Sequence, residues 1–231
     1  MSHTITDAPA PWRLQGRGYI AAFRDGQRRL DDQAAFVPPS LQGKRRGAPW
    51  AYMMFVDYAT SPVGPYHELL FIPGAFDFAQ GRYLSISRIF VSSEDSVVNG
   101  RRNWGIPKEL AQFSVQYGQE GVDRVQLSRG GKTIADLRFK PWPLPLPMVG
   151  GLVPPRWRTL GQHHEGQEFI YSPLANGIIS PASLRDARFD SAEFPDLSQA
   201  SCMACVKVRR FWMTFPEARI QALNSEAAHA A

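Results

Sequence analysis

Three features of the sequence predict a single α+β domain dominated by β-strands. Proline and glycine are abundant, with 19 of each in 231 residues, and a proline inside a periodic pattern ends or kinks a helix. Short runs rich in β-branched and aromatic residues lie between these breakers, which is typical of strands. Hydrophobic residues make up 44% of the chain and charged residues 20%, as in ordinary globular proteins. All-β domains of this length are commonly undivided, so we expect one domain over residues 1–231.

The strands are expected at intervals along the whole chain. Residues 82–92 alternate apolar and polar side chains, which favours one continuous strand. Residues 122–128 and 132–140 flank Arg129-Gly130-Gly131, and the two glycines can supply the positive φ of a tight turn, so these runs form a hairpin. The other expected strands are residues 19–23, 51–58, 67–72, 113–117, 168–171, 177–180 and 204–215.

One short helix and several loops connect the strands. Ser92 is followed three residues later by Asp95, a capping pattern that predicts a helix over 92–103, ending near Gly100 or Arg102. The segments 42–49 and 161–167 are polar or glycine-rich and are expected to be loops. The proline-rich segment 141–155 suits a stiff strap over an apolar surface better than a polyproline ligand. Residues 1–12 and 217–231 are expected to be mobile ends, the second of them an alanine-rich helical tail.

Composition and charge narrow the class of protein. The net charge is +5, but the basic residues occur in scattered pairs and not in one run, so we expect a small anionic substrate and not nucleic acid. The N-terminus lacks the basic and apolar regions of a secretory signal, and no run of 18 apolar residues is present. We therefore expect a cytoplasmic protein that does not bind membranes.

The two cysteines do not indicate a metal or redox site. Cys202 and Cys205 form one C-x-x-C that leads into a strand-like stretch, whereas zinc and thioredoxin-like sites need a second ligand pair or a following helix. His163 and His164 are adjacent, and neighbouring side chains of an extended chain point in opposite directions. We expect two buried thiols, no metal and no cofactor. The motifs of common hydrolases, nucleotide-binding proteins and zinc proteases are also absent.

Lys108 stands out among the charged residues. It follows Trp104, Gly105, Ile106 and Pro107, and the proline restricts both its own φ and the residue before it. A lysine that attacks a carbonyl must be neutral, and lowering its pKa from about 10.4 to about 7 costs roughly 4 to 5 kcal/mol. Burial among apolar neighbours can supply that shift. By residue type alone, a solvated lysine beside a turn is the alternative.

Two more charged residues lie in apolar surroundings. Glu68 is adjacent to the run Leu69–Ile72, where a carboxyl can serve as a proton shuttle or simply face solvent. Arg17 lies between glycines that permit close approach, and its guanidinium suits bidentate binding of a carboxylate. An ordinary surface arginine is the alternative for Arg17.

These three residues occur in segments that resemble the acetoacetate decarboxylase family. NGRRNWGIPKELA is similar to the family's G-R-E-x-x-x-x-P-K-K-L segment, GPYHE to its Gly-x-Tyr-x-Glu, and RGY near the N-terminus to its Arg-x-Tyr. The resemblance implies that Lys108 forms a Schiff base, that Glu68 transfers protons and that Arg17 contacts the substrate carboxylate. It also implies that Tyr66, Trp104 and Arg101 belong to the substrate site. An antiparallel β-barrel-like fold with short helices, and homo-oligomers, are further expectations.

The resemblance leaves the reaction open. It implies a small carboxylate-bearing carbonyl substrate, with decarboxylation of a β-keto acid such as acetoacetate as the first expectation. The same iminium also supports an aldol addition followed by dehydration, and a non-catalytic ligand-binding protein is a third reading. This chain departs from the family at Glu109, where a second lysine is usual. A carboxylate there would raise the pKa of Lys108 unless it faces away from the pocket.

Overall fold

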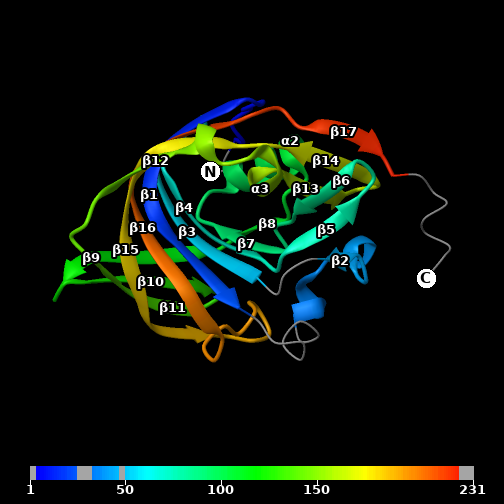
Figure 1. Cartoon of the computed structure of the whole chain (residues 1–231). Helices are drawn as coiled ribbons and strands as arrows, with labels where there is room; N and C mark the ends of the chain where they lie inside the picture. Colours follow the sequence, from blue (N-terminus) through cyan, green and yellow to red (C-terminus); the bar gives the residue numbers. More distant parts are fainter. Residues whose placement is uncertain (1–3, 25–32, 47–49, 224–231) are drawn as a thin grey trace.

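The computed structural model describes residues 4–24, 33–46 and 50–223, and it is built mainly of strands (Figure 1). The larger of two sheets has 11 strands in the order β8-β7-β4-β3-β1-β16-β15-β11-β10-β9, with β12 also paired to β15. These strands are β1 Trp12–Arg24, β3 Trp50–Thr60, β4 Tyr66–Ile72, β7 Arg88–Val91, β8 Lys108–Leu110, β9 Gln112–Gln119, β10 Val122–Arg129, β11 Lys132–Pro141, β12 Leu146–Val149, β15 Leu174–Phe189 and β16 Ser201–Phe215.

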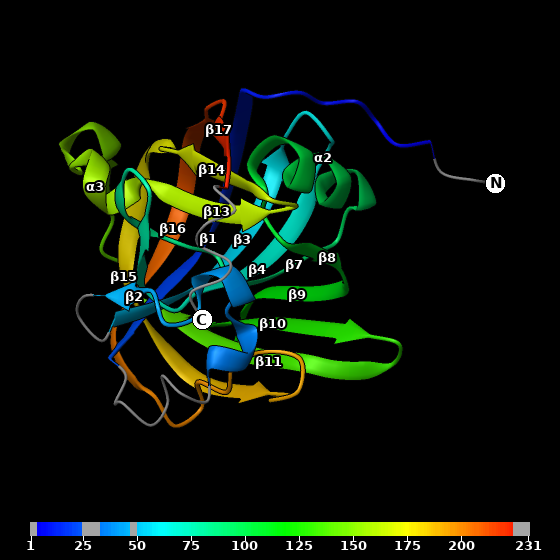
Figure 2. The ribbon, with the colours of Figure 1, turned by 90° about the vertical axis from the view of Figure 1, so that its right-hand side faces the viewer.

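The smaller sheet covers one side of the larger one. Its order is β17-β14-β13-β6-β5-β2, and its strands are β2 Arg45–Arg46, β5 Ala75–Phe78, β6 Gly81–Leu84, β13 Leu160–His164, β14 Gln167–Tyr171 and β17 Arg219–Ala222. Apart from the parallel pairs β7·β8 and β6·β13, the paired strands are antiparallel. Figure 2 shows the β9, β10 and β11 strands below this layer, where the large sheet curls round. The expected antiparallel, barrel-like α+β fold is confirmed.

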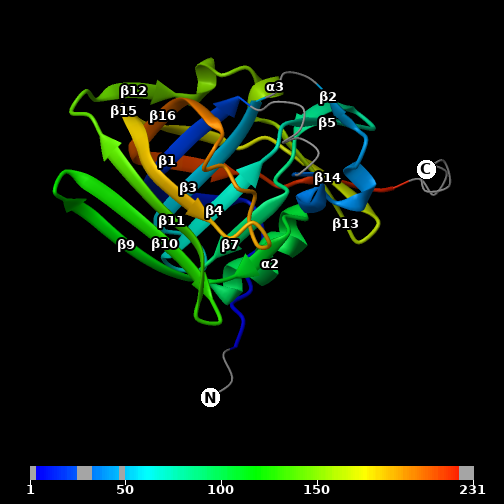
Figure 3. The ribbon, with the colours of Figure 1, turned by 90° about the horizontal axis from the view of Figure 1, so that it is seen from below.

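The two faces of the large sheet bury two separate cores because successive side chains of a strand alternate. On one face, Tyr19, Phe55 and Phe90 pack against Leu127 and Phe139 of the β9–β11 arm, which folds across that face (Figure 3). On the other face, side chains of β1, β3, β4 and β7 pack against the smaller sheet and the helix. This second core includes Leu14, Tyr58, Leu70 and Ile89 of the large sheet, Trp104 of the helix and Tyr171 of the smaller sheet. The second core surrounds the cavity described below.

The main helix, α2 Glu94–Trp104, lies between the two sheets and packs against β8 and β14. Its N-cap is Ser93, whose side chain accepts from the amide of Ser96 at 3.2 Å, so the cap lies one residue later than expected. The helix ends at Gly105, which has φ 63°. A side chain there would meet the ring of Phe169 at 2.6 Å, so this position needs glycine for both space and backbone conformation. The short helices are η1 Gln33–Phe36, η2 Pro39–Leu41, η3 Gly150–Leu152 and α3 Pro155–Arg158.

Two sequence-based expectations about the strands are wrong. The alternating run 82–92 is not one strand, because the chain leaves the smaller sheet after β6 and joins the larger one at β7. The polar segment 161–167 is not a loop but most of a β13–β14 hairpin, which turns through Glu165 and Gly166 at positive φ. Its polar residues are tolerated inside because they bond to one another, as His163 does with Glu168 at 3.3 Å.

The ends of the chain are also better held than we expected. Within 1–12, the amides of Thr6 and Ala8 donate to Asp95 and Asn99 of α2 at 2.8 and 2.9 Å. Within 217–231, residues 219–222 form a strand and not a helix. Residues 1–3 and 224–231 lie outside the described residues. The proline-rich segment runs along β15 through β12, and it leaves Trp142, Leu144 and Leu152 exposed.

Candidate functional site

Lys108 enters the second core from the edge of the large sheet. As the first residue of β8 it pairs with Ile89 of β7, and its carbonyl oxygen accepts two bonds from the guanidinium of Arg101, at 3.0 and 2.6 Å. Its aliphatic stem crosses α2 at Gly100, where a β-carbon would lie 2.6 Å from Lys108 Cδ. The glycine of the motif therefore leaves the space through which the lysine reaches the core.

The amine of Lys108 ends in a buried ion pair with Glu68. Nζ lies 3.0 Å from Glu68 Oε2, and the two side chains are only 4% and 5% exposed. Nζ also donates to Ser96 Oγ at 2.9 Å, and the phenol of Tyr58 donates to Glu68 Oε1 at 3.2 Å. The ring of Tyr66 lies 5.3 Å from Nζ. These contacts fix the amine and the carboxylate beside each other at one end of a cavity.

The electrostatics of this pair differ from the expectation of a neutral lysine. Burial by itself lowers the pKa of Lys108, but the adjacent Glu68 carboxylate and Tyr66 together outweigh burial, so the pKa lies above its ordinary value. Burial also raises the pKa of Tyr58, to which the negative charge of Glu68 adds. This environment favours the ammonium form of Lys108, and the adjacent group that can take its proton is Glu68.

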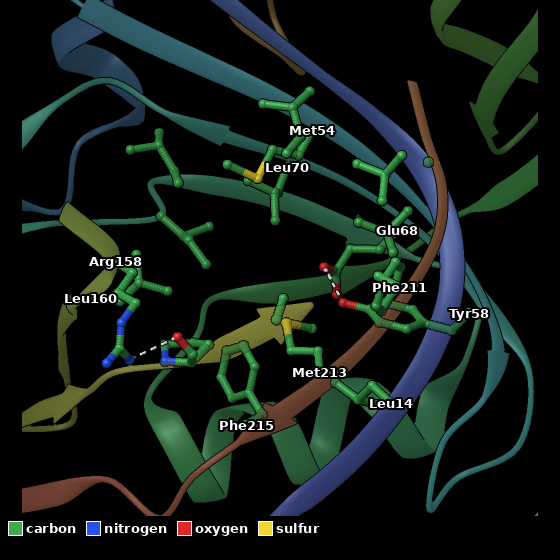
Figure 4. Close-up of a pocket in the computed structure, with 18 of the residues that line it drawn as sticks. Leu14, Met54, Tyr58, Glu68, Leu70, Arg158, Leu160, Phe211, Met213 and Phe215 are labelled. Atoms are coloured by element: carbon green, nitrogen blue, oxygen red, sulfur yellow. Dashed lines mark hydrogen bonds between the residues drawn. The ribbon is translucent and has the colours of Figure 1, made fainter. Parts of the chain in front are cut away.

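The cavity beside this pair has a volume of about 330 Å³ and an almost wholly apolar wall. Figure 4 shows Glu68 and Tyr58 on one side of it and Arg158 with Leu160 on the opposite side, with Met213 and Phe215 between them. Two of the residues expected in the substrate site, Tyr66 and Trp104, line this cavity. The indole of Trp104 donates to the carbonyl of Pro216 at 2.6 Å and packs edge-on against Trp12 and Phe215.

The structure does not bring the side chains of Arg17 and Arg101 together with Lys108 Nζ. Arg17 borders the cavity, but its Nε pairs with Asp57 at 2.9 Å and its guanidinium lies over the ring of Tyr117. Asp57 lies between Val56 and Tyr58, which line the cavity, so it and Arg17 occupy the opposite face of the sheet. Arg101 bonds the backbone of Lys108 and is not part of the cavity wall.

Glu109 points away from the cavity. It pairs with Arg88 and Arg129, the latter at 2.5 Å, and both arginines also pair with Glu193. This four-membered cluster lies on the opposite face of β8 from Lys108, as strand alternation requires. The departure from the family's second lysine therefore places no carboxylate in contact with the amine, and the carboxylate that does touch it is Glu68.

Sequence reasoning missed three residues, Ser96, Tyr58 and Arg158, and it gave no role to Gly100 although this glycine belongs to the motif. Ser96 and Gly100 are four residues apart on α2, and that spacing, which puts them on one helix face, was available in the sequence. Tyr58 faces Glu68 only because β3 pairs with β4 in this register. No sequence signal marks Arg158, which reaches the cavity from α3.

The described part of the chain also bears on metal ligands, thiols and membrane spans. Among these residues, no group of three or more His, Cys, Asp or Glu side chains could hold a metal ion. Of the two free cysteines on β16, Cys205 is buried as expected but Cys202 is exposed. No helix in the described ranges is long and apolar enough to cross a bilayer.

The fold and the site together define a class: a curled, strand-rich domain that holds a buried lysine–glutamate pair in an apolar cavity. A family model described as acetoacetate decarboxylase (ADC) matches residues 27–148, more than half of the chain, and this range includes both members of the pair. The chain belongs to the acetoacetate decarboxylase family. No curated protein matches the sequence with significance.

Several solved structures share the fold at low sequence identity. Acetoacetate decarboxylase from Legionella pneumophila matches with a TM-score of 0.67 and 16% identity, over 93% of this chain and 88% of that one. The enduracididine biosynthesis enzyme MppR complexed with pyruvate matches with a TM-score of 0.64 and 15% identity, over 92% and 91%. An acetoacetate decarboxylase-like enzyme from Sphingomonas wittichii RW1 matches with a TM-score of 0.64 and 16% identity, over 97% and 99%. These neighbours are enzymes, and their likeness establishes the fold.

Proposed function

We propose that this protein is a Schiff-base-forming lyase that decarboxylates a β-keto acid, with Lys108 as the nucleophile and Glu68 as the proton-transfer group. The observation that carries the proposal is the buried contact of Lys108 Nζ with Glu68 at 3.0 Å, at one end of an apolar cavity. An amine and a carboxylate in direct contact can exchange a proton without solvent. Membership of the family supports the same chemistry.

The reaction begins with proton transfer from the Lys108 ammonium to Glu68 as the ketone displaces water from the site. The neutral amine adds to the carbonyl carbon, and the carbinolamine loses water, with Glu68 as the acid, to give an iminium ion. The C–C bond to the carboxylate then breaks, CO₂ leaves, and the electron pair enters an enamine. Protonation of the enamine carbon and hydrolysis of the imine release the ketone and restore Lys108.

The cavity favours the bond-breaking step. Most side chains of its wall are apolar, and they include Leu14, Leu70 and Phe211. A carboxylate loses its hydration in such surroundings, whereas the CO₂ product is neutral. Tyr58 donates to Glu68 and keeps that carboxylate oriented while its other oxygen exchanges protons with the amine.

Borohydride trapping tests the lysine. The protein is incubated with a panel of β-keto acids and sodium borohydride, and the modified residue is located by peptide mass spectrometry. We expect a reduced adduct on Lys108, absent from Lys108→Met, with exposed Lys140→Met as the matched control that retains it. Because Lys108→Met leaves Glu68 buried without its partner, the double variant Lys108→Met with Glu68→Gln serves as a second protein that lacks Lys108. Turnover by either folded variant, or failure of every carbonyl compound to label Lys108, refutes the proposal.

Aldol addition with dehydration is the second candidate, and the size of the cavity is the observation that favours it. About 330 Å³ falls in the range of roughly 300–1,000 Å³ that holds drug-sized ligands, which is more space than acetoacetate needs. One structural neighbour, MppR, is complexed with the condensation product of pyruvate and imidazole 4-carboxaldehyde. Pyruvate plus an aldehyde is therefore assayed beside β-keto acids. An α,β-unsaturated product without CO₂ would select this candidate, and CO₂ without condensation would exclude it.

A further inference from the structure

Arg158 places a positive charge in the wall of the cavity, away from Lys108. Three cationic residues border the cavity in the described part of the chain: Arg17, Lys108 and Arg158. Lys108 is neutralised by Glu68, and Arg17 by Asp57 on the other face of the sheet. Arg158 is therefore the cation of the cavity wall whose charge needs explaining.

The contacts of Arg158 hold it in place without compensating its charge. Nη1 donates to three neutral oxygens of the β14–β15 connection, namely the carbonyl and hydroxyl of Ser172 at 3.0 and 2.8 Å and the carbonyl of Pro173 at 3.1 Å. Nε is buried and has no hydrogen-bond partner among the described residues. No ion pair among the described residues includes Arg158. A half-buried cation with an unused donor costs free energy unless an anion joins it.

The position of Arg158 separates this charge from the reacting groups. Figure 4 shows Arg158 and Glu68 on opposite sides of the cavity, with Met213 and Phe215 between them. An apolar stretch of ligand can contact these side chains while one end reaches Lys108 and the other reaches Arg158. The carboxylate lost in a decarboxylation is attached to the carbon next to the ketone, so it must remain near Lys108 and cannot be the group bound at Arg158.

We propose that Arg158 binds a second, distal carboxylate, and that the substrate is an apolar-chain keto diacid and not acetoacetate. The ketone and its β-carboxylate lie at Lys108, the chain fills the apolar cavity, and the terminal carboxylate pairs with the guanidinium of Arg158. The assignment of the substrate as a β-keto acid rests on the proposed function. The binding of an anion at Arg158 does not depend on it. A guanidinium presents several donors in one plane, which suits a carboxylate better than the point charge of a lysine ammonium does.

A binding experiment tests the anion position without depending on turnover. Methyl ketones of increasing chain length are each paired with the oxo acid of the same length that carries a terminal carboxylate, and dissociation constants are measured by calorimetry. We expect affinity to rise about fourfold for each methylene that fits the cavity. At the best length we expect the acid to bind about 10- to 100-fold more tightly than the ketone, the effect of a hydrogen bond to a charged group.

Variants then assign this preference to one residue. Arg158→Gln should abolish the advantage of the acid and leave the ketone unchanged, whereas Arg156→Gln, on the same short helix but exposed, should leave both unchanged. The preference should persist in Lys108→Met, so it survives even if the Schiff-base proposal fails. Equal binding of acid and ketone at every length, or equal losses for both in Arg158→Gln, overturns the anion position.

Turnover decides the substrate class. The kcat/KM of a 3-oxo diacid is compared with that of the 3-oxo monoacid of the same chain length, in the wild type and in Arg158→Gln. We expect the diacid to be favoured about 10- to 100-fold in the wild type alone. A monoacid that matches or exceeds the diacid at every length overturns the keto-diacid assignment, even where Arg158 binds anions.

Discussion

Replacing Glu68 with glutamine should lower the pKa of Lys108. The two charges are 3.0 Å apart and almost fully buried. With an effective dielectric constant near 20, their attraction is about 5 kcal/mol, and its loss lowers the pKa of Lys108. Glutamine keeps a hydrogen-bond acceptor of the same shape but removes the charge. The raised pKa of Lys108 should therefore fall, because burial is then opposed by Tyr66 and no longer by the Glu68 carboxylate.

The pH dependence of chemical modification measures this change. Wild type and Glu68→Gln are treated with brief pulses of an acylating reagent across a pH series, and the acylated fraction of Lys108 is read by peptide mass spectrometry. We expect the midpoint of Lys108 labelling to move to lower pH. Exposed Lys140 is the internal reference, and its midpoint should not move.

The same variant separates imine formation from turnover. Borohydride adducts should form at lower pH than in the wild type, whereas turnover should fall by about 10²- to 10⁴-fold because the proton-transfer group is lost. A labelling midpoint that stays in place or rises would refute the account of the ion pair. Unchanged turnover would refute the role of Glu68 as the acid and base.

Three further predictions concern the support of the site and the fold. Gly100→Ala should slow turnover at least about tenfold, because the new β-carbon meets Lys108 Cδ at 2.6 Å. The melting temperature should stay unchanged or rise, because alanine favours the helix. Normal activity of this variant would contradict the prediction. Arg17→Gln should leave the dissociation constant of carboxylate ligands within about threefold of wild type, since its partner is Asp57; a loss above tenfold would restore the role implied by the family motif. Asp123→Asn should lower the free energy of unfolding by about 3 kcal/mol in neutral denaturant titrations, with Asp186→Asn, whose side chain is 45% exposed, as the control. Burial alone would raise the pKa of Asp123, but bonds from Lys207 and Tyr19 hold it below the ordinary value, so this stability should be present above about pH 4 and lost as the pH falls through the lowered pKa; a wild-type loss in acid that persists in Asp123→Asn would contradict it.

Lys108, Glu68 and Tyr66 were identified through the family resemblance of their segments, because residue type and spacing alone left their roles open. The structure brings these three residues together beside one cavity. Strand alternation also correctly indicated that Glu109 could face away from Lys108. The same rule, applied to Arg17, places its side chain with Asp57 on the opposite face, which the motif resemblance alone did not reveal.

Errors arose where pairing between distant segments outweighed local pattern. The alternating run 82–92 divides between two sheets because its ends pair with β5 and β4. The polar segment around Gln162 became a strand because it pairs with β14, and the buried Ser85 bonds the side chain of Gln162. A local pattern reports which residues can form a strand, and only the partners determine where the strand ends.

The sequence by itself determined the fold class and the family, because alternation, turn glycines and motif spacing are properties of neighbouring residues. Only the tertiary structure decided the protonation state of Lys108 and the charge distribution of the cavity. Glu68 lies 40 residues away along the chain, and Arg158 belongs to a helix with no motif of its own. Electrostatic interaction depends on distance and burial in space, and neither quantity can be read from separation along the chain.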